Sequence, residues 1–264
     1  LHHGAPNLAP AETVNQPPRS KVATVPLTAL PLANNPRLLY YNSMPRQARV
    51  ILPGVPHHIT HRGNAQQLIF SSDQDRLTYL QYLQKSTAEN QVEVHAYCLM
   101  TNHIHLIATP QTAPGLSRAI QNAHHKYALF FNTLHQRSGH LWQDRFFSCP
   151  MDEEYFWKAL RYVELNPTRA GIAARATDYQ WSSARAHTAH QGNSRILNLP
   201  KWRAAMPPST WKNILAQDLP QAEAQRIRDK TKLGRPLGNA QFVKDTEKTL
   251  GRVLRPKPAG RPKV

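Results

Sequence analysis

Two histidines and a tyrosine–asparagine pair have residue types and spacings that could do chemistry in this chain. His103 and His105 are separated by one residue inside the apolar run MTNHIHLIATP. In a strand, residues two apart point to the same side, so both imidazoles would face one spot. Two packing histidines would show the same spacing, so the choice depends on which other side chains converge there.

The tyrosine–asparagine pair lies in RYVELNPTRAG, where Tyr162 and Asn166 stand four positions apart. In a helix, this spacing places both side chains on one face. An amide oxygen beside two imidazoles suits a borderline-to-hard divalent ion such as Mg²⁺ or Mn²⁺. A phenol one turn away could then meet a phosphate polarised by that ion. Two alternatives stay open, because Tyr155 shares this face and could be the nucleophile, and Asn166 could only cap the helix.

The charge of the chain indicates a polyanionic partner. Its 264 residues include 33 Lys and Arg against 16 Asp and Glu, a formal net charge of +17. Nucleic acid is therefore the first expectation and an anionic membrane surface the second. No apolar run approaches the roughly 18 residues of a membrane span, and no signal peptide is evident, which weakens the membrane reading. Two cysteines are too few for a zinc finger or a disulfide framework, so we expect a reducing, intracellular setting.

The elements that must position these groups follow from apolar periodicity after residue 44. Alternating and apolar runs predict strands at 55–63, 92–100, 103–109 and, as a strand or extended segment, 139–151. Helical spacing predicts helices at 71–90, 113–137 and 152–166. The order β-α-β-β-α-β-α predicts an α+β fold with a ferredoxin-like or RRM-like antiparallel sheet and packed helices.

The two ends of the chain differ in texture from this central part. Residues 1–43 are proline-rich and are expected to form a disordered extension, with Met44 as the natural start. Residues 44–190 are expected to form the catalytic domain. Residues 191–264 are expected to form a helical appendage, with helices around Trp202 and Trp211, followed by a basic DNA-binding or regulatory tail.

Three motifs taken together, NHIHLIATP, LWQDRF and YVELNPTRAG, resemble the REP-associated tyrosine transposases. These are bacterial single-strand DNA endonucleases of the HUH type, related to the single-tyrosine insertion-sequence transposases. The resemblance covers residues 44 to about 187, and the closing GRPLG and GRPKV resemble the longer members. Two other families with closely spaced histidines fit less well. Ile107 replaces the third histidine of histidine-triad hydrolases, and Ile107-Ala108 supplies neither the acid nor the histidine of metallo-β-lactamase-like hydrolases.

The resemblance implies a role for each motif residue. His103 and His105 match the two histidine metal ligands of the family, Tyr162 matches its nucleophile, and Asn166 occupies the position of the third ligand. The implied activity is cleavage and rejoining of single-stranded or hairpin DNA at REP elements through a covalent 5′-phosphotyrosine, with Mg²⁺ or Mn²⁺ as the cofactor. A catalytically silent hairpin-binding protein on the same fold is the alternative. The family also implies a monomer, rather than a dimer that shares active sites, acting at the nucleoid in the bacterial cytoplasm.

Basic and histidine side chains outside the catalytic pattern are candidate DNA contacts, because phosphate contacts supply much of the affinity for nucleic acid. These candidates are His57, His61, Arg62, Lys126, Arg145, Arg169, Arg235 and Arg261. The histidines of HHITH could equally be packing residues. Arg145 shares its side with Phe147, where a base could stack. In the tail, Arg261 could enter a narrow minor groove or serve in a general basic anchor.

Overall fold

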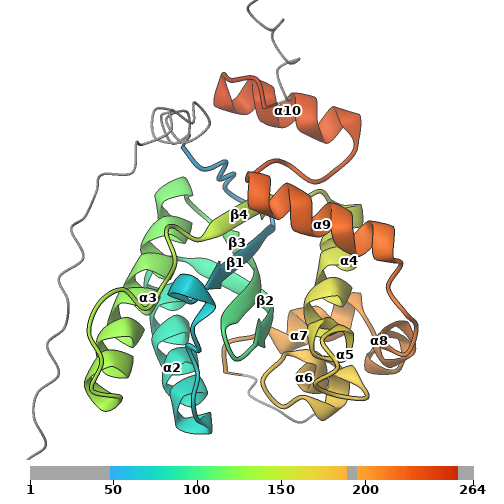
Figure 1. Ribbon diagram of the computed structural model, residues 1–264. Helices are drawn as coiled ribbons and strands as arrows, with labels where there is room; N and C mark the ends of the chain where they lie inside the picture. Colours follow the sequence, from blue (N-terminus) through green and yellow to red (C-terminus); the bar gives the residue numbers. More distant parts are fainter. Residues whose placement is uncertain (1–47, 189–194, 255–264) are drawn as a thin grey trace, which may run out of the picture. The chain divides into compact units, whose positions relative to one another are not determined.

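Apolar alternation produces the strands of the central sheet. This computed structural model describes residues 48–188 and 195–254. The bounds of the strands are β1 (His57–Arg62), β2 (Val92–Leu99), β3 (His103–Pro110) and β4 (Phe147–Pro150). They pair antiparallel in the order β2-β3-β1-β4 (Figure 1). This pairing and the packed helices confirm the predicted α+β fold with a ferredoxin-like sheet.

The helices cover both faces of this sheet (Figure 1). Their bounds are α2 (Asp73–Glu89), α3 (Ala113–Leu134), α4 (Glu153–Glu164), α5 (Asn166–Arg169), α6 (Ala184–Thr188), α7 (Leu199–Ala205), α8 (Pro208–Leu215), α9 (Gln221–Leu233) and α10 (Ala240–Leu250). Two short 3₁₀ turns are η1 (Asn64–Gln66) and η2 (Ala176–Asp178). Within the described ranges, no helix combines the length and apolar character needed to span a bilayer.

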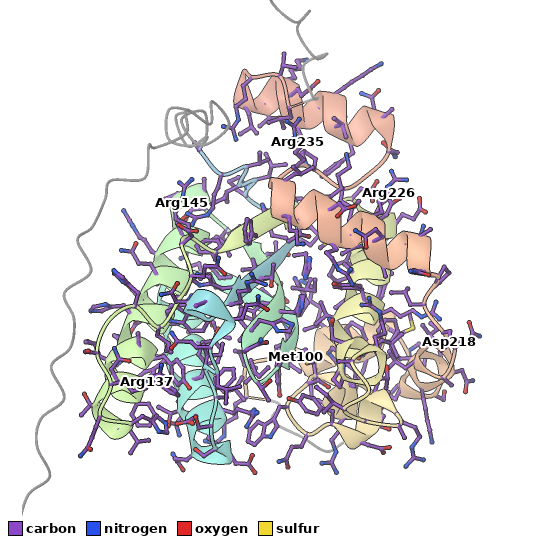
Figure 2. All side chains as sticks on the ribbon, in the orientation of Figure 1. Met100, Arg137, Arg145, Asp218, Arg226 and Arg235 are labelled. Carbon is purple, nitrogen blue, oxygen red and sulfur yellow. The ribbon has the colours of Figure 1, made fainter. Side chains whose placement is uncertain are left out.

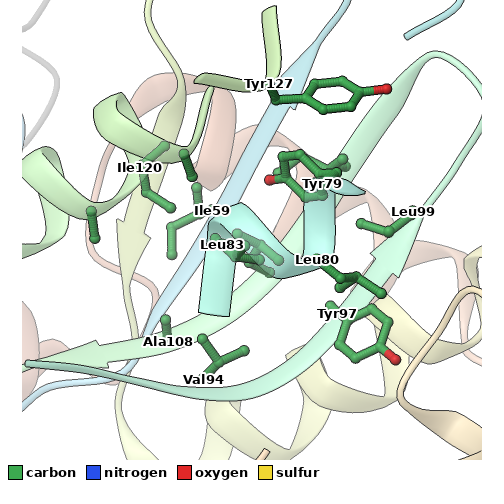
Figure 3. Close-up of a cluster of buried hydrophobic side chains, with 14 of the residues drawn as sticks. Ile59, Tyr79, Leu80, Leu83, Val94, Tyr97, Leu99, Ala108, Ile120 and Tyr127 are labelled. Atoms are coloured by element: carbon green, nitrogen blue, oxygen red, sulfur yellow. The ribbon is translucent and has the colours of Figure 1, made fainter. Parts of the chain in front are cut away.

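Each face of the sheet supports its own hydrophobic core. On the first face, Ile59 packs with Leu83 of α2 and Ile120 of α3 (Figure 3). On the second face, Ile107 packs with Leu160 of α4 and with apolar residues of α8 and α9. Full burial of such a side chain is worth about 1.5–3 kcal/mol, so the second face holds α4 and α9 firmly against the strands.

The register of the strands decides which residues share the second face. In the β1–β3 pair, His103 lies opposite Arg62 and His105 lies opposite Thr60. Directly paired residues of an antiparallel sheet point to the same side. Both histidines therefore project toward the layer that contains α4, as their spacing predicts.

Two elements are shorter than predicted. β4 occupies only the last part of the predicted segment 139–151, because the chain before it turns at Asp144, whose φ is positive at 50°. The helix predicted for 152–166 ends at Glu164, and Asn166 begins the separate turn α5. Pro167 has no N–H to donate to the carbonyl of Val163, which accounts for this break.

The C-terminal helices belong to the same packed unit as the sheet. α9 contacts β4 and β1, and the chain after it returns to β4, where the backbone N–H of Leu237 donates to the carbonyl of Pro150 at 2.9 Å. α10 begins at Asn239, whose side chain accepts from the N–H of Phe242. Residues 1–43, Met44 and Arg261 lie outside the described residues, so the expectations for them stay predictions.

Candidate active site

Three histidines and one tyrosine meet on the second face of the sheet. The rings of His103 and His105 on β3 are 5.0 Å apart between centroids. His58 of β1 stacks parallel to His105, with centroids 5.2 Å apart. Tyr162 of α4 presents its ring edge-on to both, 5.6 Å from His58 and 5.7 Å from His105. The strands and α4 therefore bring the predicted histidine pair and the predicted nucleophile together.

The hydrogen bonds of His103 decide which of its nitrogens is free. Its Nδ1 lies 2.7 Å from Oδ1 of Asn102, while Nδ2 of Asn102 donates to the carbonyl of Gln66. An amide oxygen only accepts, so Nδ1 of His103 carries the proton and donates it. Its Nε2 keeps a lone pair, as a metal ligand requires.

Burial keeps both imidazoles of the pair uncharged. It lowers the pKa of His103 from 6.5 to about 4, helped by the positive charge of Arg62. The pKa of His105 is lowered well below its usual value, first by burial and then by the neighbouring His103 and His58. A neutral imidazole is the form that binds metal ions.

Asn166 takes one of the two roles open to it from the sequence, that of a helix cap, and the ligand role stays a prediction. Its Nδ2 donates to the carbonyls of Tyr162 at 3.0 Å and Val163 at 3.3 Å, which caps the end of α4. Its Oδ1 accepts no hydrogen bond from the described residues and stays available as a ligand. In residues 48–188 and 195–254, no three His, Cys, Asp or Glu side chains gather as a metal cluster would. The predicted donor set is two imidazole nitrogens, which the sheet brings together, and the amide oxygen of Asn166, and such a set would suit Mg²⁺ or Mn²⁺.

Comparison with known proteins places this site in a family. Residues 54–166, which carry both histidines, Tyr162 and Asn166, match the family model described as "Transposase IS200 like". This segment belongs to the IS200-like transposases. Transposases cleave and rejoin DNA, so the broad class of activity follows from the family, and the resemblance found in the motifs is confirmed at this level. No curated protein matches the chain significantly.

Two solved structures are similar to this chain. One, a REP-associated tyrosine transposase bound to a REP hairpin, is 17% identical with a TM-score of 0.47, covering 55% of this chain and 85% of that one. The other, a Deinococcus radiodurans R1 protein classed as a transposase, is 18% identical with a TM-score of 0.33, covering 46% of this chain and 96% of that one. The family assignment rests on the family model and not on these distant structures.

An arginine lies over the ring of Tyr162. The guanidinium carbon of Arg169, on α5, lies 4.7 Å from the centroid of the Tyr162 ring. Arg169 and Arg228 both act on His105 by their charge. Arginine beside a phenol can stabilise both a phenolate and a phosphate oxygen. This surrounding fits a tyrosine that attacks a phosphodiester.

Tyr155, the alternative nucleophile, lies in different surroundings. Its ring is buried in the second core, with the ammonium nitrogen of Lys158 at 4.9 Å and the guanidinium carbon of Arg226 at 5.0 Å from its centroid. Among the described residues, it makes no ring contact with the site histidines. The geometry therefore favours Tyr162 as the nucleophile.

The candidate DNA contacts divide by burial. Arg62, Lys126, Arg145 and Arg169 are exposed, and Arg235 is half-buried. Arg145 lies in the loop before β4 beside α3, and Arg235 follows α9 (Figure 2). Arg62 and Arg169 are near the site, since Arg62 pairs with His103 across the sheet and Arg169 lies over the ring of Tyr162.

Two of these candidates, His57 and His61, are instead packing residues, the alternative that their sequence left open. His57 is fully buried, with Nδ1 2.7 Å from the carbonyl of Val55 and Nε2 accepting from the N–H of Leu52. His61 is 6% exposed and stacks with Trp142, and its Nδ1 lies 2.9 Å from Nδ1 of His124. Residues of odd number in β1 face the first core, which takes His57 away from any DNA on the second face. His61 reaches only a cavity of about 630 Å³ between α3 and the loop before β4.

Sequence reasoning missed His58 as a part of the site. In the strand HHITH, His58 faces the opposite side of the sheet from His57 and His61, and the sequence does not show which side faces α4.

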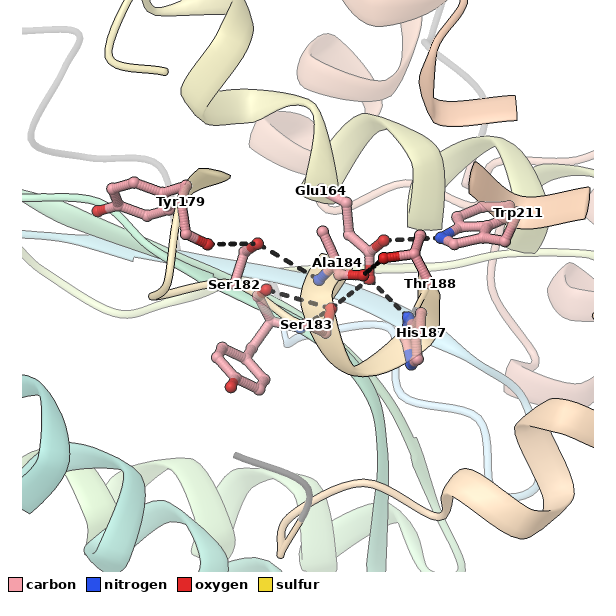
Figure 4. A network of polar contacts seen from close by, with 9 residues as sticks. Glu164, Tyr179, Ser182, Ser183, Ala184, His187, Thr188 and Trp211 are labelled. Atoms are coloured by element: carbon pink, nitrogen blue, oxygen red, sulfur yellow. Dashed lines mark hydrogen bonds and ion pairs between the residues drawn. The ribbon is translucent and has the colours of Figure 1, made fainter. Parts of the chain in front are cut away.

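Sequence reasoning also missed a buried network of hydrogen bonds behind Tyr162. Glu164 is fully buried and accepts from Nε1 of Trp211 at 2.7 Å and from the hydroxyl of Ser183, and its Oε1 lies 2.6 Å from Nδ1 of His187 (Figure 4). Nothing in the sequence indicated that Glu164 would contact Ser183 and His187 of the segment WSSARAH, because these residues match no known motif.

Proposed function

We propose that this transposase is a metal-dependent single-strand DNA endonuclease and strand transferase that acts on REP-type hairpins through Tyr162. The convergence of His103, His105 and Tyr162 on one face of the sheet carries the proposal. A silent binding protein would not need two neutral imidazoles on the same face of the sheet as a phenol. The motif resemblance and the net charge of +17 support hairpin DNA as the partner.

The residues of the chain divide the work of the reaction. The oxygen of Tyr162 attacks the phosphorus of the scissile phosphodiester, the bond from phosphorus to the 3′ oxygen breaks, and a 5′-phosphotyrosine and a 3′-hydroxyl result. The phenol proton leaves to water, and the released 3′ oxygen takes up a proton. A divalent ion bound by His103, His105 and Asn166 would act as a Lewis acid on the phosphate. Arg169 supplies a further positive charge where the phenolate develops.

The phosphotyrosine linkage keeps the energy of the broken bond. A second 3′-hydroxyl can therefore attack it, restore the phosphodiester and release Tyr162. This reversal joins strands without a nucleotide cofactor. A monomer with all four groups in one chain, acting on DNA in the bacterial cytoplasm, is sufficient for both steps.

A covalent-adduct assay tests this proposal. The protein is incubated with Mn²⁺ and a single-stranded hairpin oligonucleotide, and the products are separated under denaturing conditions. We expect a protein–DNA adduct from the wild type and from Tyr155→Phe, and none from Tyr162→Phe, whose hairpin binding should stay within a few-fold. An adduct that persists in Tyr162→Phe but disappears in Tyr155→Phe would assign the attack to the other tyrosine. Tight hairpin binding by the wild type with no adduct would favour the silent binding protein.

A further inference from the structure

A chain of hydrogen bonds connects the C-terminal helix α9 to the metal-facing histidine His105. Thr231 of α9 is 1% exposed, and its Oγ1 lies 2.7 Å from Nδ1 of His58. Nε2 of His58 lies 2.9 Å from Nδ1 of His105. At the other end, Oγ1 of Thr231 donates to the carbonyl of Ile227 at 2.7 Å. α9 lies beside β4 and β1, where it can make this connection (Figure 1).

The carbonyl of Ile227, at one end of this series of hydrogen bonds, determines which atom donates in each of the others. The carbonyl of Ile227 can only accept, so the single hydroxyl proton of Thr231 is used there. Oγ1 of Thr231 must therefore accept from Nδ1 of His58. His58 is 1% exposed and contacts no carboxylate among the described residues, so it is neutral, since a buried charge without a partner is costly. With its one proton on Nδ1, His58 has only a lone pair on Nε2.

The state of His105 is fixed in turn. Its Nδ1 faces a nitrogen that can only accept, so Nδ1 of His105 carries the proton. The lone pair of His105 is then on Nε2, the same nitrogen that Asn102 leaves free on His103. Both histidines thus keep their lone pair on Nε2, although different residues hold them in that state.

We propose that Thr231 and His58 are positioning residues that hold His105 in the tautomer able to bind the metal ion, so that α9 completes the active site. This inference rests on the metal site of the proposed function. A histidine ligand usually donates its other N–H to an outer partner, and loss of that partner typically costs 10- to 100-fold in metal affinity. Here the outer partner is another histidine, and a helix about 70 residues beyond Tyr162 in the chain sets its direction.

Thr231→Val tests this relay because it keeps the shape of the side chain and removes the hydroxyl. His58 then loses the acceptor for its Nδ1 proton. We expect that proton to move to Nε2, which forces His105 to place its own proton on Nε2 and lose the ligand lone pair. Imidazole ¹⁵N shifts of the metal-free protein report the tautomer, and Mn²⁺ titration followed by electron paramagnetic resonance reports the affinity.

Thr246→Val is the matched control, since the chain offers a second buried threonine in the same setting. Thr246 of α10 is 2% exposed, and its hydroxyl also donates to the carbonyl four residues earlier, that of Phe242 at 2.8 Å. It contacts no histidine among the described residues. We expect Thr231→Val to weaken Mn²⁺ binding about 10- to 100-fold, Thr246→Val to leave it unchanged, and Thr231→Ser to restore it.

Two results would overturn the relay. One is a wild-type His105 that carries its proton on Nε2 in the metal-free protein, a measurement that needs no variant and no metal. The other is Mn²⁺ affinity in Thr231→Val equal to that of the wild type and of Thr246→Val. A wild type that binds no Mn²⁺ but shows the expected tautomer would contradict the metal part of the proposed function and leave the relay standing.

Discussion

Substitution of the predicted metal ligands should affect cleavage to different degrees. His103 and His105 each supply one imidazole lone pair, whereas Asn166 would supply a neutral amide oxygen that water can replace. We expect His103→Ala and His105→Ala each to lower the rate of cleavage by at least about 100-fold. Asn166→Ala should cost less, and part of its loss should come from the uncapped end of α4. Single-turnover cleavage of a hairpin oligonucleotide at several Mn²⁺ concentrations measures both.

Metal dependence provides the control for these variants. Excess chelator should reproduce the loss in the wild type, and added Mn²⁺ should reverse it. Higher Mn²⁺ should rescue Asn166→Ala better than either histidine variant, because only its site keeps both imidazoles. Full wild-type activity in excess chelator would contradict the metal site altogether.

His57 makes stability depend on pH, although it lies outside the site. Burial lowers its pKa from 6.5 to about 4, and its Nε2 already accepts from the N–H of Leu52. Below pH 6.5 the unfolded chain takes up a proton that the folded chain refuses, so stability is present above that pH and falls toward pH 4. The loss from this one residue is on the order of 2–3 kcal/mol. Urea unfolding of the metal-free protein at pH 7, 5.5 and 4.5 measures it.

The variant His57→Gln separates the effect of His57 on the pH dependence of stability from the effects of the other buried histidines. His57→Gln should be less stable at pH 7 but should lose less stability between pH 7 and 4.5. His125→Gln, at an exposed position of α3, should follow the wild type at every pH. An identical pH dependence in His57→Gln and the wild type would show that His57 is already charged in the fold.

How far residues can be read from sequence depends on whether their signal is local. His103, His105 and Tyr162 were readable because their spacings are local and match a family pattern. Thr231 was unreadable, since its contact with His58 spans 173 positions and needs the packing of α9 to exist. Likewise, Arg145 and Phe147 are both exposed, as their predicted shared side requires, because alternation is a local property.

At the scale of elements, the catalytic helix α4 depends on the buried carboxylate of Glu164. This residue is two positions after Tyr162 and receives hydrogen bonds that originate in α6 and α8, with Ser183 just before α6 (Figure 4). A buried acceptor with several donors orients the element that carries it. The network therefore holds α4 in the rotation that directs Tyr162 at the histidines.

Glu164→Gln should disrupt this arrangement with little change of shape. The new amide group would meet one of the present donors, which leaves buried groups unpaired at a cost of about 1–3 kcal/mol. We expect the midpoint of urea unfolding to fall and covalent-adduct formation to slow, while Mn²⁺ affinity stays near that of the wild type. Glu154→Gln, on the exposed side of the same helix, is the control and should change little. Equal stability of the two variants would show that the network does not hold α4.

The elements themselves were largely predictable, and their ends were not. Periodicity located the strands and the long helices, because each buries one face. The segment 139–151 ended as a short β4 after a loop, since the turn at Asp144 requires a positive φ that no local pattern announced. The split between α4 and α5 shows the same limit, because Pro167 predicted an end but not that a new turn would start at Asn166.

At the scale of the whole molecule, the excess of positive charge determines how DNA binding depends on salt. A truncation that tests this must leave the buried residues of the fold in place. A cut after Leu233 would remove Leu237, which is fully buried in the second core and pairs with Met151. Such a variant would lose stability as well as charge. Deleting 255–264 keeps every described residue, Leu237 included, and removes Arg255, Lys257, Arg261 and Lys263.

Deletion of 255–264 should make the plot of log affinity against log salt shallower, by about 0.7 for each phosphate of single-stranded DNA that the segment neutralises. Discrimination between the cognate hairpin and a scrambled one should barely change if the tail is a general anchor, because Arg62 and the other cations near the sheet remain. Fluorescence anisotropy at several salt concentrations measures both quantities. Replacing the same four cations by glutamine in the full-length chain separates charge from length. An unchanged salt slope together with a loss of discrimination would instead assign sequence or shape readout to the segment AGRPKV.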